Sequence, residues 1–386
     1  MFFSINNFHI TTSTTLSDST FFSKWNNLEP DYTLTKYFHF LESVKPVDIT
    51  FIYIIIEKDI AGKRVVCGKC YVQNVLFKPD NVKLTNPFLA FLCRLFLRVR
   101  PFRLFIYGNV FAVDFPTVSF EPSLINKEDI AMLLVGINEK YKSDVLILKD
   151  LPDVFQPELM SSVGLEKYST DLTMTMEILP EWNSMTDYTS ALTKKYRKRA
   201  MKIMEKGKAL SRRVLSLGEI RDRRVQIDEL LNQVAKNQLV RIGILDGSYL
   251  EKYMAQFPDV FKITGIFLDD KMVGFYSRID RGEMLEIHYI GMDYKLKESH
   301  LLYFNMLFFA LEDSILEKRK QLELGRTARE AKASLGCKPE YFNDYLRINN
   351  AASRFLANRL TGFFQDEMGN TWLERHPFSG KNASTS

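Results

Sequence analysis

The chain has 386 residues, of which 46% are hydrophobic and 13% aromatic, and its formal net charge is +5. This length exceeds what one ordinary hydrophobic core accommodates, so we expect two domains. The composition describes a globular protein with ample core material, and so mild a charge does not by itself indicate nucleic-acid binding.

The first half of the chain has the pattern of a mixed α/β domain. Alternating and β-branched runs predict strands, and apolar residues at helical spacing predict one helix. In chain order these are strands at 49–57, 65–77 and 104–113, a helix at 127–141 and a short buried strand at 144–148.

Residues 88–105 form an apolar segment that is interrupted by four cations, Arg94, Arg98, Arg100 and Arg103. The spacing predicts a short amphipathic helix with the cations on one face, followed by a strand. One interpretation is that this helix packs on its own domain. The other is peripheral contact with the inner face of the cell membrane, which would also suit a lipid substrate.

The four cysteines show no pairing pattern, which is typical of a reducing compartment. Cys67 and Cys70 form a lone C-x-x-C, and we expect their side chains to point to opposite faces of a strand. Zinc would need two further ligands, so no metal is predicted. The first residues lack the pattern of a secretory signal, and no apolar run of about 18 residues predicts a spanning helix. These features favour a cytoplasmic protein.

The second half begins near residue 171 and also mixes strands and helices. Its elements are a strand at 173–178, helices at 187–206 and 225–237, strands at 261–268, 272–278 and 284–290, a helix at 300–318 capped by Ser299, and a strand at 322–324. The division predicted is a first domain at 1–170, a second at 171–380 and a disordered tail at 381–386.

Two basic segments of the second half are candidates for binding an anion. The first is the run from Lys194 to Arg213, which is either a solvated helix surface or a docking face for a pyrophosphate, an RNA acceptor stem or anionic headgroups. The second follows Gly325, where Thr327 and Glu330 have the spacing of a capping box. Cations at that helix start would hold an anion beside free N–H groups, unless the segment is simply a well-capped surface helix.

The order of these elements, with its motifs, resembles the GNAT-fold acyltransferases of the FemAB-like or BioF2-like (peptidoglycan-building-type) group. The resemblance covers 171–349 well and the first half weakly, in its strand order and the FIYGN stretch at 105–109. It implies an α/β (α+β) fold of two tandem GNAT-like domains with mixed, mostly antiparallel sheets and flanking helices. The residues that carry it are Thr189, Leu192, Lys195 and Arg197 of the basic helix, and Arg326, Thr327, Glu330, Lys332, Leu335 and Gly336 of the closing motif.

This resemblance implies an N-acyltransferase that moves an acyl or aminoacyl group to an amine in envelope or lipid assembly. The donor would be acyl-CoA, an acyl carrier or aminoacyl-tRNA, used as a co-substrate with no tightly bound cofactor. The chain departs from single-domain GNAT enzymes at 290–299, where one glycine, Gly291, replaces a glycine-rich pyrophosphate loop. Two alternatives stay open: a lipid (sphingoid or amino-lipid) N-acyltransferase at the membrane surface, and a non-catalytic anion-binding protein.

Acyl transfer to an amine needs a proton acceptor, a polarised carbonyl and a proton path to the leaving group. Alternation puts Glu286 and His288 on one face of a strand, which makes His288 the candidate base or proton shuttle, unless it is a hydrogen-bonded sheet histidine. Tyr289 or Tyr303 would protonate the leaving group, and Asp293 would orient the amine. The anion-binding candidates are Arg326, Thr327, Lys332, Lys195 and Arg197, with Glu330 as a cap rather than a catalyst.

Overall fold

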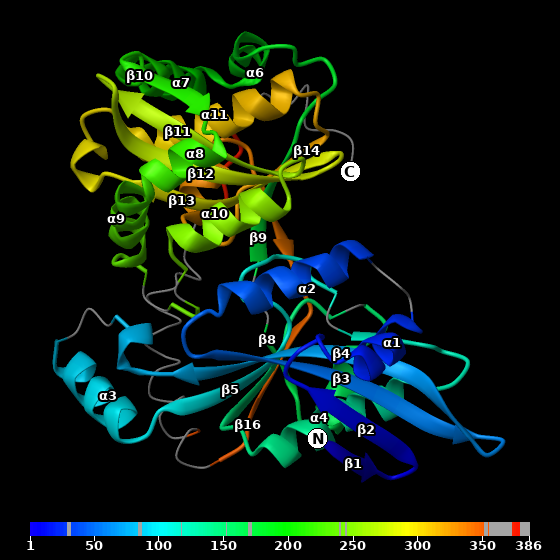
Figure 1. Cartoon of the computed structure of the whole chain (residues 1–386). Helices are drawn as coiled ribbons and strands as arrows, with labels where there is room; N and C mark the ends of the chain where they lie inside the picture. Colours follow the sequence, from blue (N-terminus) through cyan, green and yellow to red (C-terminus); the bar gives the residue numbers. More distant parts are fainter. Residues whose placement is uncertain are drawn as a thin grey trace. The chain divides into compact units, whose positions relative to one another are not determined.

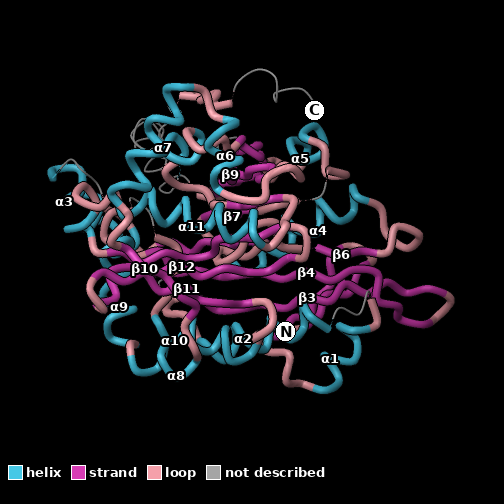
Figure 2. Tube along the Cα trace, turned by 90° about the horizontal axis from the view of Figure 1, so that it is seen from above, coloured by secondary structure: helices cyan, strands magenta, loops and turns pink. Residues whose placement is uncertain are grey.

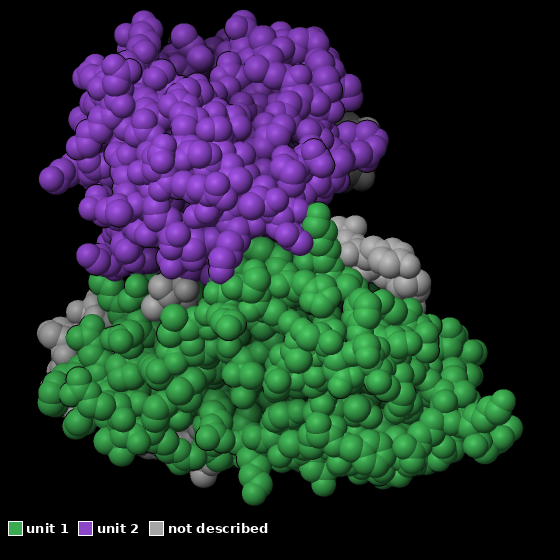
Figure 3. Space-filling view, in the orientation of Figure 1, with its two compact units in different colours: residues 1–171, 239–244, 341–370 green, residues 172–238, 245–340, 371–386 purple. Residues whose placement is uncertain are grey.

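The computed structural model describes residues 1–28, 32–83, 87–116, 118–151, 153–168, 172–238, 241–243, 245–350, 354 and 373–378, with only the backbone at 32, 33, 87–89 and 92. It divides into two compact units, coloured separately in Figure 3. Unit 1 comprises 1–171, 239–244 and 341–370, and unit 2 comprises 172–238, 245–340 and 371–386. The division expected from the sequence is contiguous. In the structure, unit 1 also includes 239–244 and 341–370, which interrupt the sequence of unit 2. The predicted tail at 381–386 lies outside the described residues.

Unit 1 is built on a nine-stranded sheet with the order β1-β2-β3-β4-β5-β7-β16-β8, and β6 pairs with β4. The last strand in the sequence, β16, therefore completes a sheet that begins at the N-terminus (Figure 1). The strands are β1 (Phe2–Ile5), β2 (Phe8–Ser13), β3 (Ile49–Ile60), β4 (Lys63–Phe77), β5 (Phe102–Tyr107), β6 (Val118–Phe120), β7 (Val145–Leu148), β8 (Glu166–Tyr168) and β16 (Asp344–Ile348). The helices are α1 (Ser19–Asn26), α2 (Tyr32–Val44), η1 (Pro79–Asn81), α3 (Pro87–Val99), α4 (Lys127–Tyr141) and α5 (Pro157–Ser162).

Helix α4 shows why the periodicity of the first half could be interpreted directly. Asn126 accepts a hydrogen bond from the Asp129 N–H at 2.7 Å and so caps the first turn. The helix ends where Lys142 adopts a left-handed conformation. Its inward residues are fully buried against the sheet, and they include Ile130, Leu133, Leu134 and Ile137. The predicted helix at 127–141 is confirmed at both ends.

The two cysteines of the C-x-x-C motif do not point to opposite faces, so that expectation is wrong. The pairing of β3 with β4 shifts register between Ile56 and Glu57, which leaves Cys67 as an extra residue in β4. The bulge rotates Cys67 onto the face of Cys70, and both thiols are buried in one apolar cluster. Burial raises the pKa of Cys67 to about 11 and also raises that of Cys70, which is typical of structural thiols.

Unit 2 is built on a seven-stranded sheet with the order β10-β11-β12-β13-β14-β9-β15. Its strands are β9 (Leu172–Glu177), β10 (Leu210–Val214), β11 (Phe261–Leu268), β12 (Lys271–Arg281), β13 (Met284–Met292), β14 (Gln321–Glu323) and β15 (Lys338–Tyr341). Its helices are α6 (Met185–Ala191), α7 (Lys194–Lys206), α8 (Leu217–Asp222), α9 (Arg224–Ala235), α10 (Gly247–Gln256), η2 (Tyr294–Leu296), α11 (Leu302–Leu316) and α12 (Arg329–Ala333).

Helices cover both faces of this second sheet. In Figure 2, α8, α9 and α10 lie on one side of the strands, and α6, α7 and α11 lie on the other. Leu285 and Ile287 of β13 belong to the core cluster under α6, α7 and α11. Because side chains alternate along a strand, Glu286 and His288 face the α10 side. The predicted sharing of a face by these two residues is confirmed by a 3.6 Å approach of His288 Nδ1 to Glu286 Oε1.

The helix predicted at 187–206 is in fact two helices. Leu192 is extended, with ψ of 146°, and Thr193 is extended as well, so the chain turns between α6 and α7. Arg197 stabilises this turn, since its guanidinium donates to the carbonyl oxygens of Thr189, Ser190 and Leu192 at distances between 2.6 and 3.0 Å. The residues of this segment favour helix, so the sequence gives no signal for the break. The break depends instead on the contacts of the Arg197 side chain.

In the described part of each unit, a parallel strand pair is connected through a helix. In unit 1, β5 and β7 are parallel neighbours and α4 lies between them in the sequence. In unit 2, β13 and β14 are parallel neighbours and α11 lies between them. The long hairpins β3–β4, β11–β12 and β12–β13 are antiparallel. The predicted fold class, mixed and mostly antiparallel sheets with flanking helices, is confirmed.

Candidate active site

Strands β13 and β14 pair over a short stretch and then separate. We call the end of this pairing, at Glu286 and Glu323, the parting point. Their parallel ladder joins 284–286 to 321–323 and stops there, because β14 ends at Glu323. Strand β13 continues to Met292. Among the described residues no strand pairs with this edge of β13 after Glu286. Free backbone groups at a sheet edge can bind the polar backbone or carbonyl of a ligand.

A β-bulge lies directly after this parting point. Arg278 pairs with Ile287 and Tyr276 with Ile290, so the single residue Ser277 faces both His288 and Tyr289. The Ser277 hydroxyl oxygen accepts a hydrogen bond from the Tyr289 N–H at 2.9 Å and donates to the Tyr289 carbonyl at 3.3 Å. The bulge bends β13 and places two consecutive side chains next to each other.

His288 lies in a pocket of aromatic rings. Its Nε2 is 2.9 Å from the hydroxyl of Tyr249, a residue of α10. The rings of Tyr249, Tyr253, Phe261 and Tyr289 have centroids between 4.6 and 6.1 Å from the imidazole. The side chain is only 3% exposed. The sequence-predicted base is therefore held firmly by α10, β11 and its own strand, and solvent has little direct access to it.

Glu286 connects His288 to a cation at the end of the β12–β13 hairpin. The Arg281 Nε donates to Glu286 Oε2 at 2.5 Å, while Glu286 Oε1 faces His288. Burial disfavours the ionised form of Glu286, but the interaction with His288 and the charge of Arg281 outweigh it, and its pKa is lowered. Arg281, Glu286, His288 and Tyr249 thus form one continuous polar chain.

Glu323 is a second buried carboxyl, at the point where the strands part. It pairs in register with Glu286 across the parallel ladder. Its Oε1 accepts hydrogen bonds from the Thr173 hydroxyl and from the Gly325 N–H, the latter at 2.6 Å. Its Oε2 is buried without a hydrogen-bond partner among the described residues. Burial, and then the charge of Glu286, raise the pKa of Glu323 to about 7.

Lys332 is buried beneath the loop that follows β14, and does not reach outward to an anion. Its Nζ donates to the Gly325 carbonyl at 2.9 Å, and only 3% of the residue is exposed. Burial lowers the pKa of Lys332 to about 8, against the nearby charge of Glu323. Arg326 is only half-buried, on the same loop. The two cations predicted to converge on one anion therefore lie in different environments. Lys332 is buried and binds the loop's backbone, whereas Arg326 is half-buried.

The capping box predicted at Thr327 is wrong. Helix α12 begins at Arg329 and is only five residues long, and the residue before it, Ala328, is left-handed with φ of 53°. The N-cap position is therefore occupied by Ala328, which makes no side-chain capping hydrogen bond, and Thr327 lies one residue before it. Glu330 instead forms an exposed ion pair with Arg375. So short a helix offers no anion site at its start, and Ser299 is displaced as the cap of α11 in the same way, by a left-handed Leu301.

The remaining sequence-predicted catalytic residues are only partly brought together. Tyr289 lies beside His288 in the bulge. Asp293 caps η2 by accepting from the Lys295 N–H at 3.0 Å, which is a structural role. Tyr303 lies on α11 and packs against the core on the opposite face of the sheet, where burial raises its pKa. Only Tyr289 of these three shares a face with His288.

The basic run is divided among several contacts. Arg197 is occupied by the carbonyls that end α6, as described above. Arg212 pairs with Glu312 and Asp313, and Arg213 pairs with Glu219. Lys195 is exposed and lies over the ring of Tyr196. Arg197, Arg212 and Arg213 thus stabilise unit 2 itself, while the lysines of the run are exposed.

Unit 1 has the equivalent strand pair but not the open edge. Its β5 and β7 pair from Leu104 to Tyr107, and the Lys149 N–H then donates to the Tyr107 carbonyl at 2.8 Å. The pairing therefore runs to the end of β5 and one step beyond. The counterpart of the parting point in unit 2 is closed here, so the candidate active site is assigned to unit 2.

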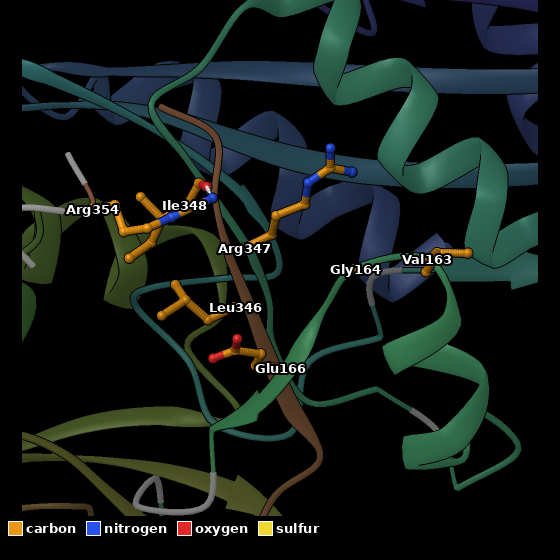
Figure 4. Close-up of a pocket in the computed structure, with 7 residues that line it drawn as sticks. All are labelled: Val163, Gly164, Glu166, Leu346, Arg347, Ile348 and Arg354. Carbon is orange, nitrogen blue, oxygen red and sulfur yellow. Dashed lines mark hydrogen bonds between the residues drawn. The ribbon is translucent and has the colours of Figure 1, made fainter. Parts of the chain in front are cut away.

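A cavity of about 610 Å³ lies elsewhere, in unit 1, and is lined by residues of β8, β16 and the segment before β8 (Figure 4). It contains none of the residues of the β13–β14 site. Figure 4 shows Arg347 and Arg354 pointing in different directions, and Arg347 pairs with Glu139 while Arg354 donates to the Ile348 carbonyl. Among the described residues, no group of three or more metal-ligating side chains occurs, and no helix is long and apolar enough to cross a membrane.

Several site residues escaped the interpretation of the sequence. Tyr249 belongs to α10, which was not predicted, although Asp246 gives a capping signal there by accepting from Ser248 and Tyr249 N–H groups. Glu323 sits between Leu322 and Leu324, and this alternation could have placed it on the face opposite the core. Arg281 could have been placed near Glu286 from the register of the β12–β13 hairpin alone. Thr173 could not be found, because it meets Glu323 across 150 residues of sequence.

Two units that each combine a strand meander, a helix and a parallel strand define a tandem GNAT fold, and the parted strands with their buried polar chain define its candidate active site. The sequence matches no protein-family profile and no curated protein. Among solved structures, a tandem GNAT protein from the clavulanic acid biosynthesis pathway, solved without AcCoA, matches with a TM-score of 0.50 and 10% identity over 88% of this chain and 98% of that one.

Two other matches fall slightly lower. FemX matches with a TM-score of 0.46 and 10% identity, over 91% of this chain and 99% of that one. L-PGS from Bacillus licheniformis matches with a TM-score of 0.46 and 12% identity, over 88% of this chain and 98% of that one. The fold assignment rests on the tandem GNAT protein.

Proposed function

We propose that this chain is an N-acyltransferase that moves an acyl or aminoacyl group from an activated donor to an amine, at the parting point of β13 and β14. The observation that carries the proposal is the open edge of β13 beside two buried carboxyls and His288. Its backbone groups can hold the donor's carbonyl, and the polar chain can take up a proton. The proposed acceptor class is an amine in envelope or lipid assembly, as the resemblance to the FemAB-like group implies.

In the proposed reaction, the amine nitrogen attacks the donor's carbonyl carbon, and the bond to the leaving group then breaks. N–H groups of the open edge would stabilise the oxyanion that forms on the carbonyl oxygen. Proton acceptance is assigned to the group formed by His288, Glu286 and Glu323. A carboxyl that titrates near neutral pH, as Glu323 does with a pKa of about 7, is suited to this role. Tyr289, partly exposed beside His288, would return a proton to the leaving group.

We propose acyl-CoA as the donor, because the matched tandem GNAT protein was solved in a form specified as without AcCoA. The junction between β13 and α11 carries two exposed cations, Lys295 and Lys297, which suit a phosphorylated donor. Asn305 fixes this junction, because its amide donates to the carbonyls of His300 at 2.7 Å and of Ile203 at 3.1 Å. Acyl carrier and aminoacyl-tRNA donors remain part of the same proposal, and Lys195 is one of the exposed cations of the basic run that would meet them.

A non-catalytic role is a second candidate, and the enclosure of His288 favours it. A side chain only 3% exposed and held at Nε2 by Tyr249 has the features of a structural histidine. In that case unit 2 would bind an anionic ligand without turnover. The two functions make different predictions for the same variants.

The test is acyl transfer from acetyl-CoA, palmitoyl-CoA and aminoacyl-tRNA to a panel of amines, followed by mass spectrometry of the product. His288→Gln and Glu323→Gln are each expected to lower turnover by about 10²-fold or more if the residue carries the proton. His39→Gln, at an exposed histidine of unit 1, is the matched control and should retain activity. Binding of CoA without transfer, unchanged by His288→Gln, would establish the non-catalytic role. No binding and no transfer with any donor would contradict the proposal.

A further inference from the structure

Helix α3 presents a stripe of large apolar side chains to solvent. Phe91 is 63% exposed, Leu95 50% and Val99 81%. These positions are four residues apart, so they lie on one side of the helix. Three exposed apolar residues in register on 13 residues of helix form a continuous surface rather than scattered single residues.

The stripe is not needed to hold α3 on unit 1. Ala90, Cys93 and Leu97 occupy the other side of the helix and are buried. They pack in one cluster with apolar residues of β4 and β5, among them Phe102 and Leu104. The helix is therefore apolar on two sides, one of which forms core contacts, and the outward side is available for a partner.

The charged residues next to the stripe in the sequence are all cations. Residues 81–113 contain five cations, Lys83, Arg94, Arg98, Arg100 and Arg103, and no acidic residue. Arg94 and Arg98 are exposed on α3 itself, next to the stripe. Arg100 is paired with Asp144 at 3.2 Å, so it contributes less. A surface with apolar side chains bordered by guanidinium groups is complementary to an apolar layer bordered by phosphates.

We propose that α3 docks unit 1 on an anionic lipid surface, with Phe91, Leu95 and Val99 entering the boundary of the acyl chains and Arg94 and Arg98 binding lipid phosphates. The helix lies in the plane of the interface and does not span the membrane. A second copy of the chain is the competing occupant of the stripe, and the test below distinguishes it from a lipid surface. This docking is independent of the acyl transfer proposed for unit 2.

The test is flotation of the full chain with vesicles of phosphatidylcholine, alone or mixed with phosphatidylglycerol. Binding is expected with phosphatidylglycerol and should weaken as salt rises. The double variant Phe91→Ser/Leu95→Ser should bind at least about ten-fold more weakly, because two apolar side chains no longer leave water. Arg94→Gln/Arg98→Gln should lose the preference for phosphatidylglycerol. Val225→Ser, at a 72% exposed apolar residue of unit 2, is the matched control and should bind as the wild type does.

A second measurement does not depend on a loss of binding. Tryptophan emission of Leu95→Trp should shift to shorter wavelength when phosphatidylglycerol vesicles are added, and should stay unchanged with phosphatidylcholine alone. The proposal is overturned if the wild type does not float with phosphatidylglycerol vesicles, or if the stripe variant floats equally well. It is also overturned if light scattering shows that the stripe variant converts a dimer to a monomer while vesicle binding is absent, since a second copy would then cover α3.

Discussion

Replacement of Glu323 by glutamine tests the buried carboxyl pair through the pH dependence of stability. Glutamine keeps the shape of the side chain and can still accept from the Gly325 N–H, but it does not ionise. The pKa of Glu323 is about 7 in the folded chain, against 4.5 for an ordinary glutamate. The folded state therefore binds the proton more tightly than the unfolded state does.

The sign of the effect follows from this difference. The stability that the neutral carboxyl contributes is fully present below about pH 4.5 and is lost as the pH rises through about 7. A shift of this size corresponds to about 3 kcal/mol, and we expect about 1 to 3 kcal/mol because real sites relax and admit water. Glu286 has a lowered pKa, so its contribution is lost only at more acidic pH. Lys332 titrates from about pH 8 upward, where its stability effect has the opposite sign.

The assay is urea unfolding between pH 5 and pH 7.5, with the free energy of unfolding measured at each step. The wild type should lose stability relative to Glu323→Gln across this interval, and the variant should be the more stable protein at the upper end. Glu330→Gln is the matched control, because Glu330 is an exposed glutamate a few residues away on α12. Parallel pH profiles of the free energy of unfolding for the wild type and Glu323→Gln would refute the conclusion that burial raises the pKa of Glu323.

Three further predictions concern the residues that support the site. Tyr249→Phe removes the hydrogen bond to His288 but keeps the ring, so the free energy of unfolding should fall by about 1 kcal/mol, and an unchanged pH profile of transfer would remove Tyr249 from the proton path. Asn305→Leu leaves the carbonyls of His300, before α11, and of Ile203, in α7, without their buried donor and should cost about 2 to 3 kcal/mol, measured by thermal unfolding. Arg197→Ala should lower stability by about 1 to 2 kcal/mol, whereas Lys195→Ala, at an exposed position, should change it by less than about 0.5 kcal/mol. Equal effects of these last two variants would contradict the role given to Arg197 at the end of α6.

Local patterns in the sequence determined many of the regular elements, although β1, β2, α1 and α2 were not predicted. The helix at 127–141 and the strand at 261–268 have the predicted limits. The alternation that put Glu286 and His288 on one face holds as well. These features depend on the spacing of apolar residues within one segment, and that spacing is visible without knowledge of the partner segments.

Backbone geometry between elements was decided by the tertiary structure. Left-handed conformations at Ala328 and Leu301 displaced both predicted caps, and a bulge turned Cys67 onto the face of Cys70. No propensity of alanine or leucine predicts φ above zero, because such residues adopt it only where surrounding contacts enforce it.

The chemistry of the site was likewise decided by the fold. Glu323 meets Glu286 because two strands separated by α11 pair in parallel with one particular register, and Thr173 reaches Glu323 from a strand at the start of unit 2. His288 finds Tyr249 because α10 packs over β11 and β13. Periodicity states which face of an element is apolar, but only the packing of whole elements determines which polar side chains lose water together, and that loss of water is what raises the pKa of Glu323.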